Sequence, residues 1–318
     1  MDYSDVRIVF AGDTDYANCA NRVALAINSY TGFRCARVVL NVKHRLGYKQ
    51  DLYTSSGGAK KAISHLRSGS RRLTLTTGDG SYRLAKSIST DTGCPIGSLH
   101  VGTPYREESS RFDGKDKAEG SIIRFISPDS VYLTDMDCLP YLHCVDNVRE
   151  RSIYKCTTPI VFHSPTSSSK KGTSLILSAV EDAIKRVAPK SFKYRVISGV
   201  SYERCTNQRR SGHVFIDQLN TRIGGFGYSS VEAASEGLVP VASMNNSPGT
   251  IWSSVGLDEP PILGVVDKMS LSDLLCSLMS DSDLLYKKRV EAYEWATRGS
   301  VSMFKAGKYY VEQICKVI

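Results

Sequence analysis

Short apolar segments alternate with segments of helical spacing along most of the 318 residues, and this alternation restricts the fold more than any other feature. The first unit is the clearest, with an apolar run at residues 6–11, a turn at residues 12–15 and helical spacing over residues 16–29. The next strand is predicted at residues 37–42. Because repeats and low-complexity tracts are absent from the sequence, the alternation predicts an α/β protein whose parallel sheets are covered by helices.

The same pattern continues and divides the chain into two series. In the first, strands are expected at residues 72–76, 96–101, 122–126 and 131–134. The second begins after Pro159, with strands expected at residues 160–163, 194–198, 213–216 and 239–242. A helix is predicted over residues 173–187, with apolar positions at Leu175, Ile176, Ala179, Val180 and Ile184. Two more helical patterns, residues 281–298 and 301–318, are separated by Gly299 and Ser300.

These patterns predict two domains and a terminal helix. The expected bounds are residues 1–155, residues 156–300 and residues 301–318. A hydrophobic content of 41% in 318 residues is enough for two ordinary cores. The nine cysteines show no CxxC spacing, and their odd number indicates reduced thiols in a cytoplasmic compartment. We expect no signal peptide and no membrane span, because the first apolar run is short and is preceded by acids.

The positive charge of the chain is concentrated in one stretch. The net charge is +9, and residues 34–72 contain ten basic residues but only one acid, Asp51. Phe33, Tyr48 and Tyr53 are interleaved, which suits base stacking beside phosphate contacts and indicates a polyanionic partner such as nucleic acid. A solvated face that keeps the protein soluble, or anionic lipid headgroups, would account for the same charges.

A glycine-rich turn at residues 221–228 precedes a predicted helix. Gly224, Gly225 and Gly227 would let backbone N–H groups approach a phosphate, and a helix that begins after Tyr228 would direct its positive end toward it. Glu232 lies one turn inside this helix. The pattern is typical of a nucleotide-sugar site, although any α/β protein can contain such a loop and helix.

Two segments carry a family resemblance. The sequences HSPTSSSKKGTSLILSAVEDAI, at residues 163–184, and HVFIDQLNTRIGGFGYSSVEAASEGLVPVAS, at residues 213–243, resemble the donor-binding half of GT-B glycosyltransferases, particularly family 4. Weaker similarities are the turn at Gly12, GSLHVGTPYREE at residues 97–108 and DMDCLPYLHCVD at residues 135–146. The resemblance implies two Rossmann-like domains facing across a cleft, with the nucleotide-sugar in the second, the acceptor in the first, and a terminal helix crossing back to the first.

The resemblance also implies donor-site roles for particular residues. Lys171 matches a lysine that contacts the donor diphosphate, and Glu232 matches the glutamate that holds the ribose. The remaining positions of the implied donor site are Gly12, Lys170, Gly172, Gly199, Val200, Gly225, Phe226, Gly227, Tyr228, Ser229 and Ser230. Five of these residues have a simpler alternative: Lys170 and Lys171 as a solvated pair, Glu232 as a first-turn acid, and Ser229 and Ser230 as helix caps.

Two positions depart from the family pattern. Gly224 stands where a second glutamate near the sugar is usual, and Thr166 stands where an arginine is expected. Lys170 would replace that arginine only in part. Both departures leave the identity of the sugar open.

In the first domain the resemblance implies an acceptor site. His100 would hydrogen-bond a sugar hydroxyl or share a proton, and Asp13 would act as general base; their alternatives are a structural histidine and an Asx-turn. The basic residues expected at the acceptor are Arg34, Arg37, Lys43, Arg45, Lys49, Lys60, Lys61 and Arg106.

We expect no metal and no cofactor beyond the nucleotide-sugar co-substrate. Asp135 and Asp137 form an Asp-x-Asp pattern, which binds a divalent metal in another glycosyltransferase architecture, but Asp13 and Asp15 form it too, so at least one match is accidental. His163 has no second ligand at helical spacing.

The activity that the resemblance implies is transfer of a glycosyl group from a nucleoside-diphosphate sugar, UDP favoured, with retained anomeric configuration. The basic stretch favours a hydroxymethylated base of bacteriophage DNA as acceptor, which would place the protein in the host cytoplasm. The alternatives are a bacterial enzyme that decorates a surface polysaccharide or lipid-linked acceptor on an anionic membrane, and a non-catalytic binding module. The sequence carries no signal for self-association.

Overall fold

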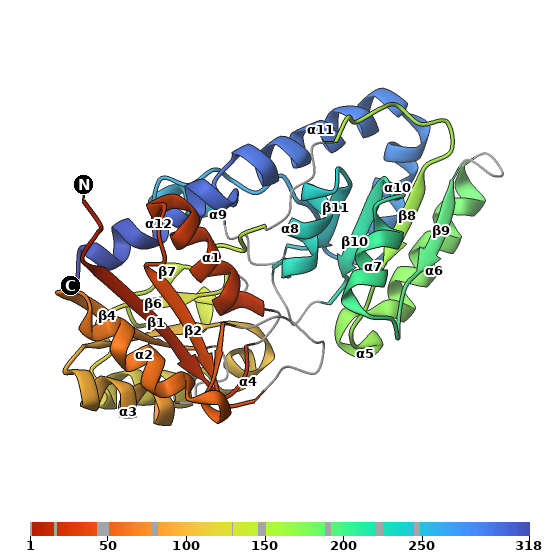
Figure 1. Cartoon of the computed structure of the whole chain (residues 1–318). Coiled ribbons are helices and arrows are strands. Elements are labelled where there is room, and N and C mark those ends of the chain that lie inside the picture. Colours follow the sequence, from red (N-terminus) through yellow and green to blue (C-terminus); the bar gives the residue numbers. More distant parts are fainter. Residues whose placement is uncertain are drawn as a thin grey trace. The chain divides into compact units, whose positions relative to one another are not determined.

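The chain forms two compact units, which are described separately. The structure is a computed structural model that describes residues 2–15, 18–42, 51–77, 82–128, 130–145, 151–187, 192–220, 225–244 and 249–318, with the backbone alone for 103, 104 and 249–251. Unit 1 consists of Met1–Asp146 and Ser302–Ile318, and unit 2 is Asn147–Val301 (Figure 1). The division therefore falls before the predicted boundary at residue 155 and close to the predicted start of the terminal helix.

A parallel seven-stranded sheet forms the centre of unit 1, in the order β3-β2-β1-β4-β5-β6-β7. Its central strand β1 pairs with β2 and β4, and Ile8 lies opposite both Ala36 and Leu73. Six of the seven β1 residues are buried, as expected for a strand covered on both faces. The strands are β1 (Val6–Gly12), β2 (Ala36–Leu40), β3 (Leu52–Tyr53), β4 (Arg71–Thr76), β5 (Ile96–His100), β6 (Arg124–Ile126) and β7 (Leu139–Pro140).

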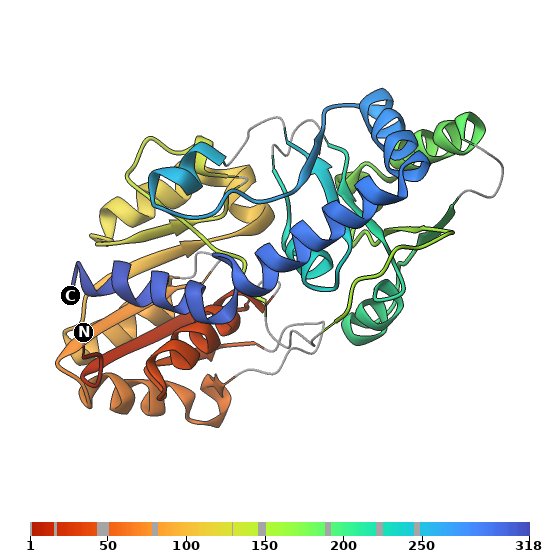
Figure 2. The same cartoon turned by 90° about the horizontal axis from the view of Figure 1, so that it is seen from above.

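Helices cover both faces of this sheet. On one face, α2 (Gly58–Arg67) and α3 (Tyr82–Thr92) pack on a cluster that includes Val9, Val39 and Leu66. On the other, α1 (Cys19–Thr31) lies beside α12 (Met303–Cys315), as Figure 1 and Figure 2 show. Their approach requires Gly307, because a Cβ there would lie 2.0 Å from the carbonyl oxygen of Ala26. The end of the chain thus returns to unit 1.

Unit 2 contains a second parallel sheet, in the order β12-β11-β10-β8-β9. Its strands are β8 (Ile160–His163), β9 (Lys193–Val196), β10 (Val214–Gln218), β11 (Val239–Ser243) and β12 (Leu263–Val265). Its helices are α5 (Ser168–Lys171), α6 (Thr173–Arg186), α7 (Tyr202–Arg209), α8 (Tyr228–Ser235), α9 (Gly249–Ser254), α10 (Lys268–Ser280) and α11 (Ser282–Arg298). All nine cysteines lie in the described ranges and are free thiols.

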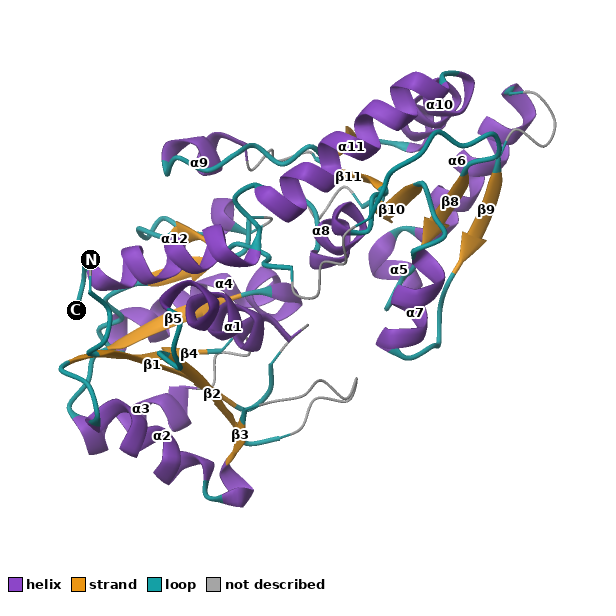
Figure 3. Ribbon diagram, turned by 45° about the horizontal axis from the view of Figure 1, so that its top comes forward, coloured by secondary structure: helices purple, strands orange, loops and turns teal. Residues whose placement is uncertain are grey.

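The second sheet lies between layers of helices (Figure 3). A cluster of buried side chains packs on each of its faces. On one face, α6 and α10 pack on Val161, Ile216 and Val241. On the other, Phe162 and Phe215 pack against α7 and α8. Leu175 and Ile184 were expected on the apolar face of α6 but are 49% and 42% exposed, since Ile176, Ala179, Val180 and Ala183 already cover the sheet.

The predicted alternation is confirmed, with one wrong strand. Residues 131–134 were expected to be a strand, but Val131–Leu133 is a 3₁₀ helix in which only Val131 is buried. The predicted start of the first helix at residues 16 and 17 lies outside the described residues. The helix α4 (Gly102–Ala118) is kinked at Glu108. No helix in the described parts of the chain is both long enough and apolar enough to span a bilayer.

Candidate functional site

The carboxyl ends of β8 and β10 bring the predicted donor residues to one edge of the sheet in unit 2. His163 ends β8 and Gln218 ends β10, and the two strands are hydrogen-bonded neighbours. Parallel strands end at the same edge, where the following helices begin. Lys171, at the end of α5, and Gly227, before α8, therefore both lie at this edge.

Asp217 connects these segments. Its Oδ1 accepts hydrogen bonds from Lys171 Nζ at 2.5 Å and from Ser229 Oγ at 2.7 Å. Its Oδ2 accepts from the backbone N–H of Gly227 at 2.6 Å and from Ser230 Oγ at 3.0 Å. A carboxylate has about four acceptor positions, so these contacts satisfy Asp217, which is 2% exposed. Asp217 therefore acts as a fixed anion and is not available as a general base.

The charge of Asp217 is maintained despite burial. Burial raises its pKa, but the Lys171 ammonium and the hydrogen bonds from Lys171, Ser229 and Gly227 lower the pKa to about 2. The positive end of α8 favours the same ionised state. Asp217 therefore stays charged across the physiological range and keeps Lys171 beside the beginning of α8.

Lys171 retains hydrogen-bonding capacity in this arrangement. Besides Asp217, its ammonium donates to Gln218 Oε1 at 3.3 Å. In the described part of the chain these two contacts occupy two of its three N–H groups. Its side chain is 19% exposed. Gln218 Nε2 in turn donates to the carbonyl of Gly225 at 2.5 Å, which fixes the glycine-rich loop.

Gly172 places Lys171 against the end of β10. It has a φ of +68°, and a Cβ there would lie 1.9 Å from the carbonyl oxygen of Leu219. The backbone N–H of Leu219 also donates to the carbonyl of Lys171 at 3.0 Å. A side chain at position 172 would force the two segments apart, which explains the Lys-Gly order of the sequence.

Glu232 lies on the side of α8 that contacts α7. Tyr202 Oη donates to its Oε1 at 2.6 Å, and Arg209 Nη2 donates to its Oε2 at 3.2 Å. The residue is 7% exposed. It lies beyond the first turn of α8, so the alternative of a first-turn acid does not describe it. Gly199, whose φ is +67°, and Val200 precede α7 at the same edge, and Gly199 is exposed.

The other implied donor residues are placed as follows. The loop from Gly225 to Ser230 contacts Asp217 and Gln218, but the side chain of Phe226 is buried against Trp252, with ring centroids 6.2 Å apart.

Lys170 is exposed, and its carbonyl accepts from Asn220 Nδ2 at 2.7 Å. Gly12 ends β1 in unit 1 and is buried there. Gly224 lies outside the described residues, and Thr166 is exposed.

His163 is a structural residue. Its Nδ1–H donates to the carbonyl of Ile216 at 2.8 Å, and its Nε2 lies 2.9 Å from Thr173 Oγ1. Burial lowers the pKa of this imidazole, so it is neutral at physiological pH. No cluster of three or more His, Cys, Asp or Glu suited to a metal occurs among the described residues. Asp135 and Asp137 are exposed and follow a 3₁₀ helix at the place where a strand was predicted, residues 131–134.

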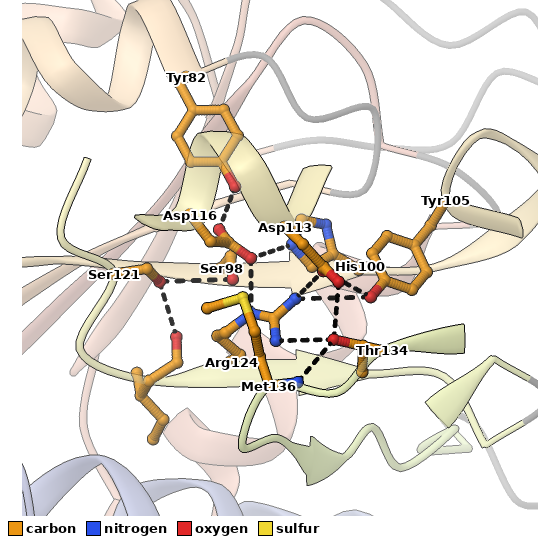
Figure 4. A network of polar contacts seen from close by, with 11 residues as sticks. Tyr82, Ser98, His100, Tyr105, Asp113, Asp116, Ser121, Arg124, Thr134 and Met136 are labelled. Carbon is orange, nitrogen blue, oxygen red and sulfur yellow. Dashed lines mark hydrogen bonds and ion pairs between the residues drawn. The ribbon is translucent and has the colours of Figure 1, made fainter. Parts of the chain in front are cut away.

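His100 lies in a buried polar network of unit 1, shown in Figure 4. It is completely buried, its Nε2 lies 2.7 Å from Asp116 Oδ2, and its ring stacks on Tyr105 with centroids 4.6 Å apart. Arg124 Nε also donates to Asp116 at 2.6 Å, and Tyr82 Oη donates to the same carboxylate. An enclosed imidazole does not face an acceptor, so the geometry supports the structural alternative. Tyr105 and Asp116, both on α4, cover the histidine that the resemblance implied for the acceptor site.

Asp13 is exposed at the end of β1. Asn41 Nδ2 donates to its Oδ1 at 2.5 Å, so an acceptor hydroxyl would have to compete for this carboxylate. Asp15 has a different environment, because it is buried and accepts the backbone N–H groups of Ala20 and Asn21, each at 2.9 Å. Asp15 therefore stabilises the beginning of α1, and the two acids of this Asp-x-Asp pattern do not share a site.

The basic stretch is partly neutralised. Arg37 donates to both oxygens of Asp51, at 2.9 and 3.1 Å, and Arg71 pairs with Asp5 at 2.5 Å. Arg34, by contrast, is 66% exposed, and its contact with Asp51 is long, with 3.9 Å between Nη1 and Oδ1. Lys60 and Lys61 are exposed on α2. Arg106 is half-buried. Lys43, Arg45, Lys49 and Tyr48 lie outside the described residues.

Sequence reasoning missed four residues of this arrangement: Asp217, Gln218, Tyr202 and Arg209. A signal existed for the first two, since they follow the apolar run at residues 214–216. Polar residues at the carboxyl end of a parallel strand are candidates for a ligand site. No such signal marked Arg209, which lies 23 residues before Glu232 in the sequence and reaches it from another helix.

No protein-family model and no curated protein matches this sequence. Among solved structures the chain is similar to Anabaena Alr3699/HepE in complex with UDP-glucose, with a TM-score of 0.65 and 10% identity over 97% of this chain and 99% of that one. It is also similar to UDP-GlcNAc 2-epimerase from Neisseria meningitidis bound to UDP-GlcNAc, with a TM-score of 0.54 and 12% identity over 97% and 100% of the chains.

A third similar structure is the pneumococcal O-GlcNAc transferase GtfA in complex with UDP and GlcNAc. Its TM-score is 0.51, with 11% identity over 77% of this chain and 57% of that one. Identities this low show a shared fold and no more. The chain therefore has the two-sheet, Rossmann-like GT-B fold that glycosyltransferases and UDP-sugar epimerases share.

Proposed function

We propose that this protein is a glycosyltransferase that takes its sugar from a nucleoside-diphosphate sugar, with UDP as the favoured nucleotide. The observation that supports it most is Asp217, which joins Lys171 to Gly227, Ser229 and Ser230, residues from separate parts of the sequence that were each expected at the donor. The similar structures add support, because HepE, GtfA and the epimerase were each solved with UDP or a UDP-sugar.

In the proposed complex the diphosphate binds at the beginning of α8. Lys171 would contribute one positive charge, and the N–H groups near Gly225 and the helix dipole would contribute partial ones. Glu232 would accept the ribose hydroxyls, and the base would lie near Gly199 and Val200. All of these groups belong to unit 2.

The proposed chemistry is mainly electrostatic. The bond between the anomeric carbon and the diphosphate oxygen breaks, and the anomeric carbon forms a new bond to the acceptor oxygen. Lys171 and the loop amides stabilise the charge that develops on the diphosphate, and the departing diphosphate takes the acceptor proton. The family resemblance favours retention at the anomeric carbon. The proposal assigns no role to a metal, and it leaves His100 out of the catalytic groups because of its burial.

The favoured acceptor is a hydroxymethylated base in DNA. Arg34, Lys60 and Lys61 are exposed on unit 1 and would contact phosphates, whereas Arg37 is paired with Asp51. An enzyme that modifies a base must take it out of the stack, and the contacts to the backbone would offset part of that cost. A surface polysaccharide or a lipid-linked sugar is the alternative acceptor.

A UDP-sugar epimerase is the second candidate function, because one of the similar structures is such an enzyme. A glycosyltransferase consumes the nucleotide-sugar and releases UDP, whereas an epimerase changes the configuration of the sugar. The products therefore distinguish the two functions. A binding module would give neither product.

One experiment tests both donor and acceptor. The protein is incubated with a panel of UDP-sugars, with and without hydroxymethylcytosine-containing DNA, and nucleotides and digested nucleosides are analysed by mass spectrometry. We expect UDP release and a hexosylated or pentosylated nucleoside that depends on the DNA. UDP release without a modified nucleoside would support the proposed donor but exclude DNA as the acceptor. An epimerised sugar, or no turnover of any donor, would contradict the proposed function.

A further inference from the structure

The carboxylate of Glu232 is held by two donors from α7. Tyr202 is the first residue of this helix and donates to Oε1 at 2.6 Å, while Arg209 is the last and donates to Oε2 at 3.2 Å. The two donors approach different oxygens, so together they fix both the position and the plane of the carboxylate.

Arg209 is a rigid support for this arrangement. It is 2% exposed, its Nε donates to Glu236 Oε2 at 2.7 Å, and its guanidinium lies 5.4 Å from the ring centroid of Phe215. Burial lowers the pKa of Arg209, but Glu232 and Glu236 raise it further than burial lowers it, so the group remains cationic. Tyr202 is different, because it is half-buried at the beginning of α7, beside Gly199 and Val200.

We propose that Tyr202 is a positioning residue that orients Glu232 for two neighbouring hydroxyls and thereby makes this site selective for ribonucleotides over 2′-deoxyribonucleotides. The inference rests on the proposed donor site. A carboxylate with a fixed plane accepts both hydroxyls of a vicinal diol, whereas a 2′-deoxyribose leaves one of these contacts unmade. Sites built to bind a hydroxyl reject analogues that lack it, because a buried polar group then remains unpaired.

The test compares UDP with 2′-deoxy-UDP by isothermal titration calorimetry. We expect the wild-type protein to bind UDP roughly tenfold more tightly than 2′-deoxy-UDP, the size of one hydrogen bond to a charged group. Tyr202→Phe removes one hydroxyl and frees the carboxylate to rotate. This variant should bind UDP about five- to tenfold more weakly, whereas its binding of 2′-deoxy-UDP should change much less. The ratio of the two dissociation constants should therefore approach one.

A matched control is Tyr194→Phe. Tyr194 is also in unit 2, and its buried hydroxyl has no hydrogen-bond partner among the described residues. We expect this variant to keep the wild-type ratio. An unchanged ratio in Tyr202→Phe, including an equal loss of affinity for both nucleotides, would overturn the positioning role. A wild-type protein that binds neither nucleotide would instead overturn the donor site itself.

Discussion

The ammonium of Lys171 lies 2.5 Å from Oδ1 of Asp217, although 46 residues separate the two in the sequence. Asp217 also accepts hydrogen bonds from the N–H of Gly227 and from Ser229 and Ser230 at the start of α8. A buried acid thereby fixes the cation that we expect to bind a diphosphate. We therefore expect both the stability of unit 2 and the proposed donor chemistry to depend on this contact.

Removal of the buried acid should destabilise unit 2. Asp217→Ala leaves Lys171 and three further donors without their acceptor, so we expect a loss of about 3 kcal/mol in the free energy of unfolding. Both tryptophans, Trp252 and Trp295, lie in unit 2, so the urea dependence of tryptophan fluorescence reports on that unit. Ser229→Ala is the control, with an expected loss of about 1 kcal/mol for one hydrogen bond. Equal losses in both variants would contradict the central position of Asp217.

Because the pKa of Asp217 changes on folding, the stability of unit 2 should depend on pH. The pKa of Asp217 falls from 3.8 to about 2 on folding, so its contribution is fully present above pH 3.8 and is lost as the pH falls toward 2. The shift corresponds to about 2 kcal/mol. The free energy of unfolding, measured with urea at pH 7 and at pH 3, should therefore decrease less between these two values in Asp217→Asn than in the wild type. Identical pH profiles of the two proteins would exclude this contribution.

A side chain at position 172 should separate Lys171 from β10. Gly172→Ala introduces a Cβ 1.9 Å from the carbonyl oxygen of Leu219, at a φ of +68°. Gly256→Ala is a matched control, since Gly256 has a φ of +74° and no atom within 4 Å of its added Cβ. Both variants have the left-handed strain, but we expect Gly172→Ala to lose about 2 kcal/mol more, because overpacking is added. Affinity for UDP, measured by calorimetry, should fall in Gly172→Ala alone.

The two charged donor residues should affect different kinetic constants. Lys171→Ala removes the charge that we propose stabilises the leaving diphosphate, so kcat should fall by about 10² to 10³. Glu232→Ala removes the proposed contacts to the ribose, which would be made both before and during transfer, so the donor KM should rise roughly tenfold with a smaller change in kcat. Initial rates of UDP release at varied donor concentration measure both constants. Wild-type kinetics in both variants would contradict the site.

Binding of DNA should depend on the exposed part of the basic stretch. If DNA is the acceptor, log Kd should increase linearly with log salt concentration, and the Lys60→Ala/Lys61→Ala double variant should reduce the slope by about 1 to 2. Arg37→Ala is the control, because Arg37 is already paired with Asp51 and its removal should leave the slope nearly unchanged. Fluorescence anisotropy at several salt concentrations provides these slopes. Affinity that does not respond to salt would exclude a DNA acceptor.

Much of the fold was predictable because it depends on local patterns. The apolar runs around Val9 and Val161 show up in the sequence as buried parallel strands. The short strands β3, β7 and β12 were not predicted, since two or three residues carry no periodicity and form strands only by pairing with distant segments. The order of the strands depends on the same distant pairing.

The site was predictable only in part, for a related reason. Lys171, Gly227 and Glu232 belong to recognisable local motifs, whereas Asp217 and Arg209 gain their importance from contacts between segments far apart in sequence. His100 shows the opposite case, in which the resemblance implied a histidine that contacts the acceptor. Helix α4 carries Tyr105 and Asp116 over it, and that covering contact cannot be deduced from residues near His100 alone.

The position of bound UDP tests the donor site most directly. A crystal of this protein grown with UDP should show the diphosphate within hydrogen-bond distance of Lys171 Nζ and of amides of the segment from Gly225 to Tyr228 other than that of Gly227, whose N–H donates to Asp217. The ribose hydroxyls should contact the carboxylate of Glu232. A UDP molecule bound elsewhere in the protein, with Lys171 and Glu232 free of nucleotide, would contradict the account.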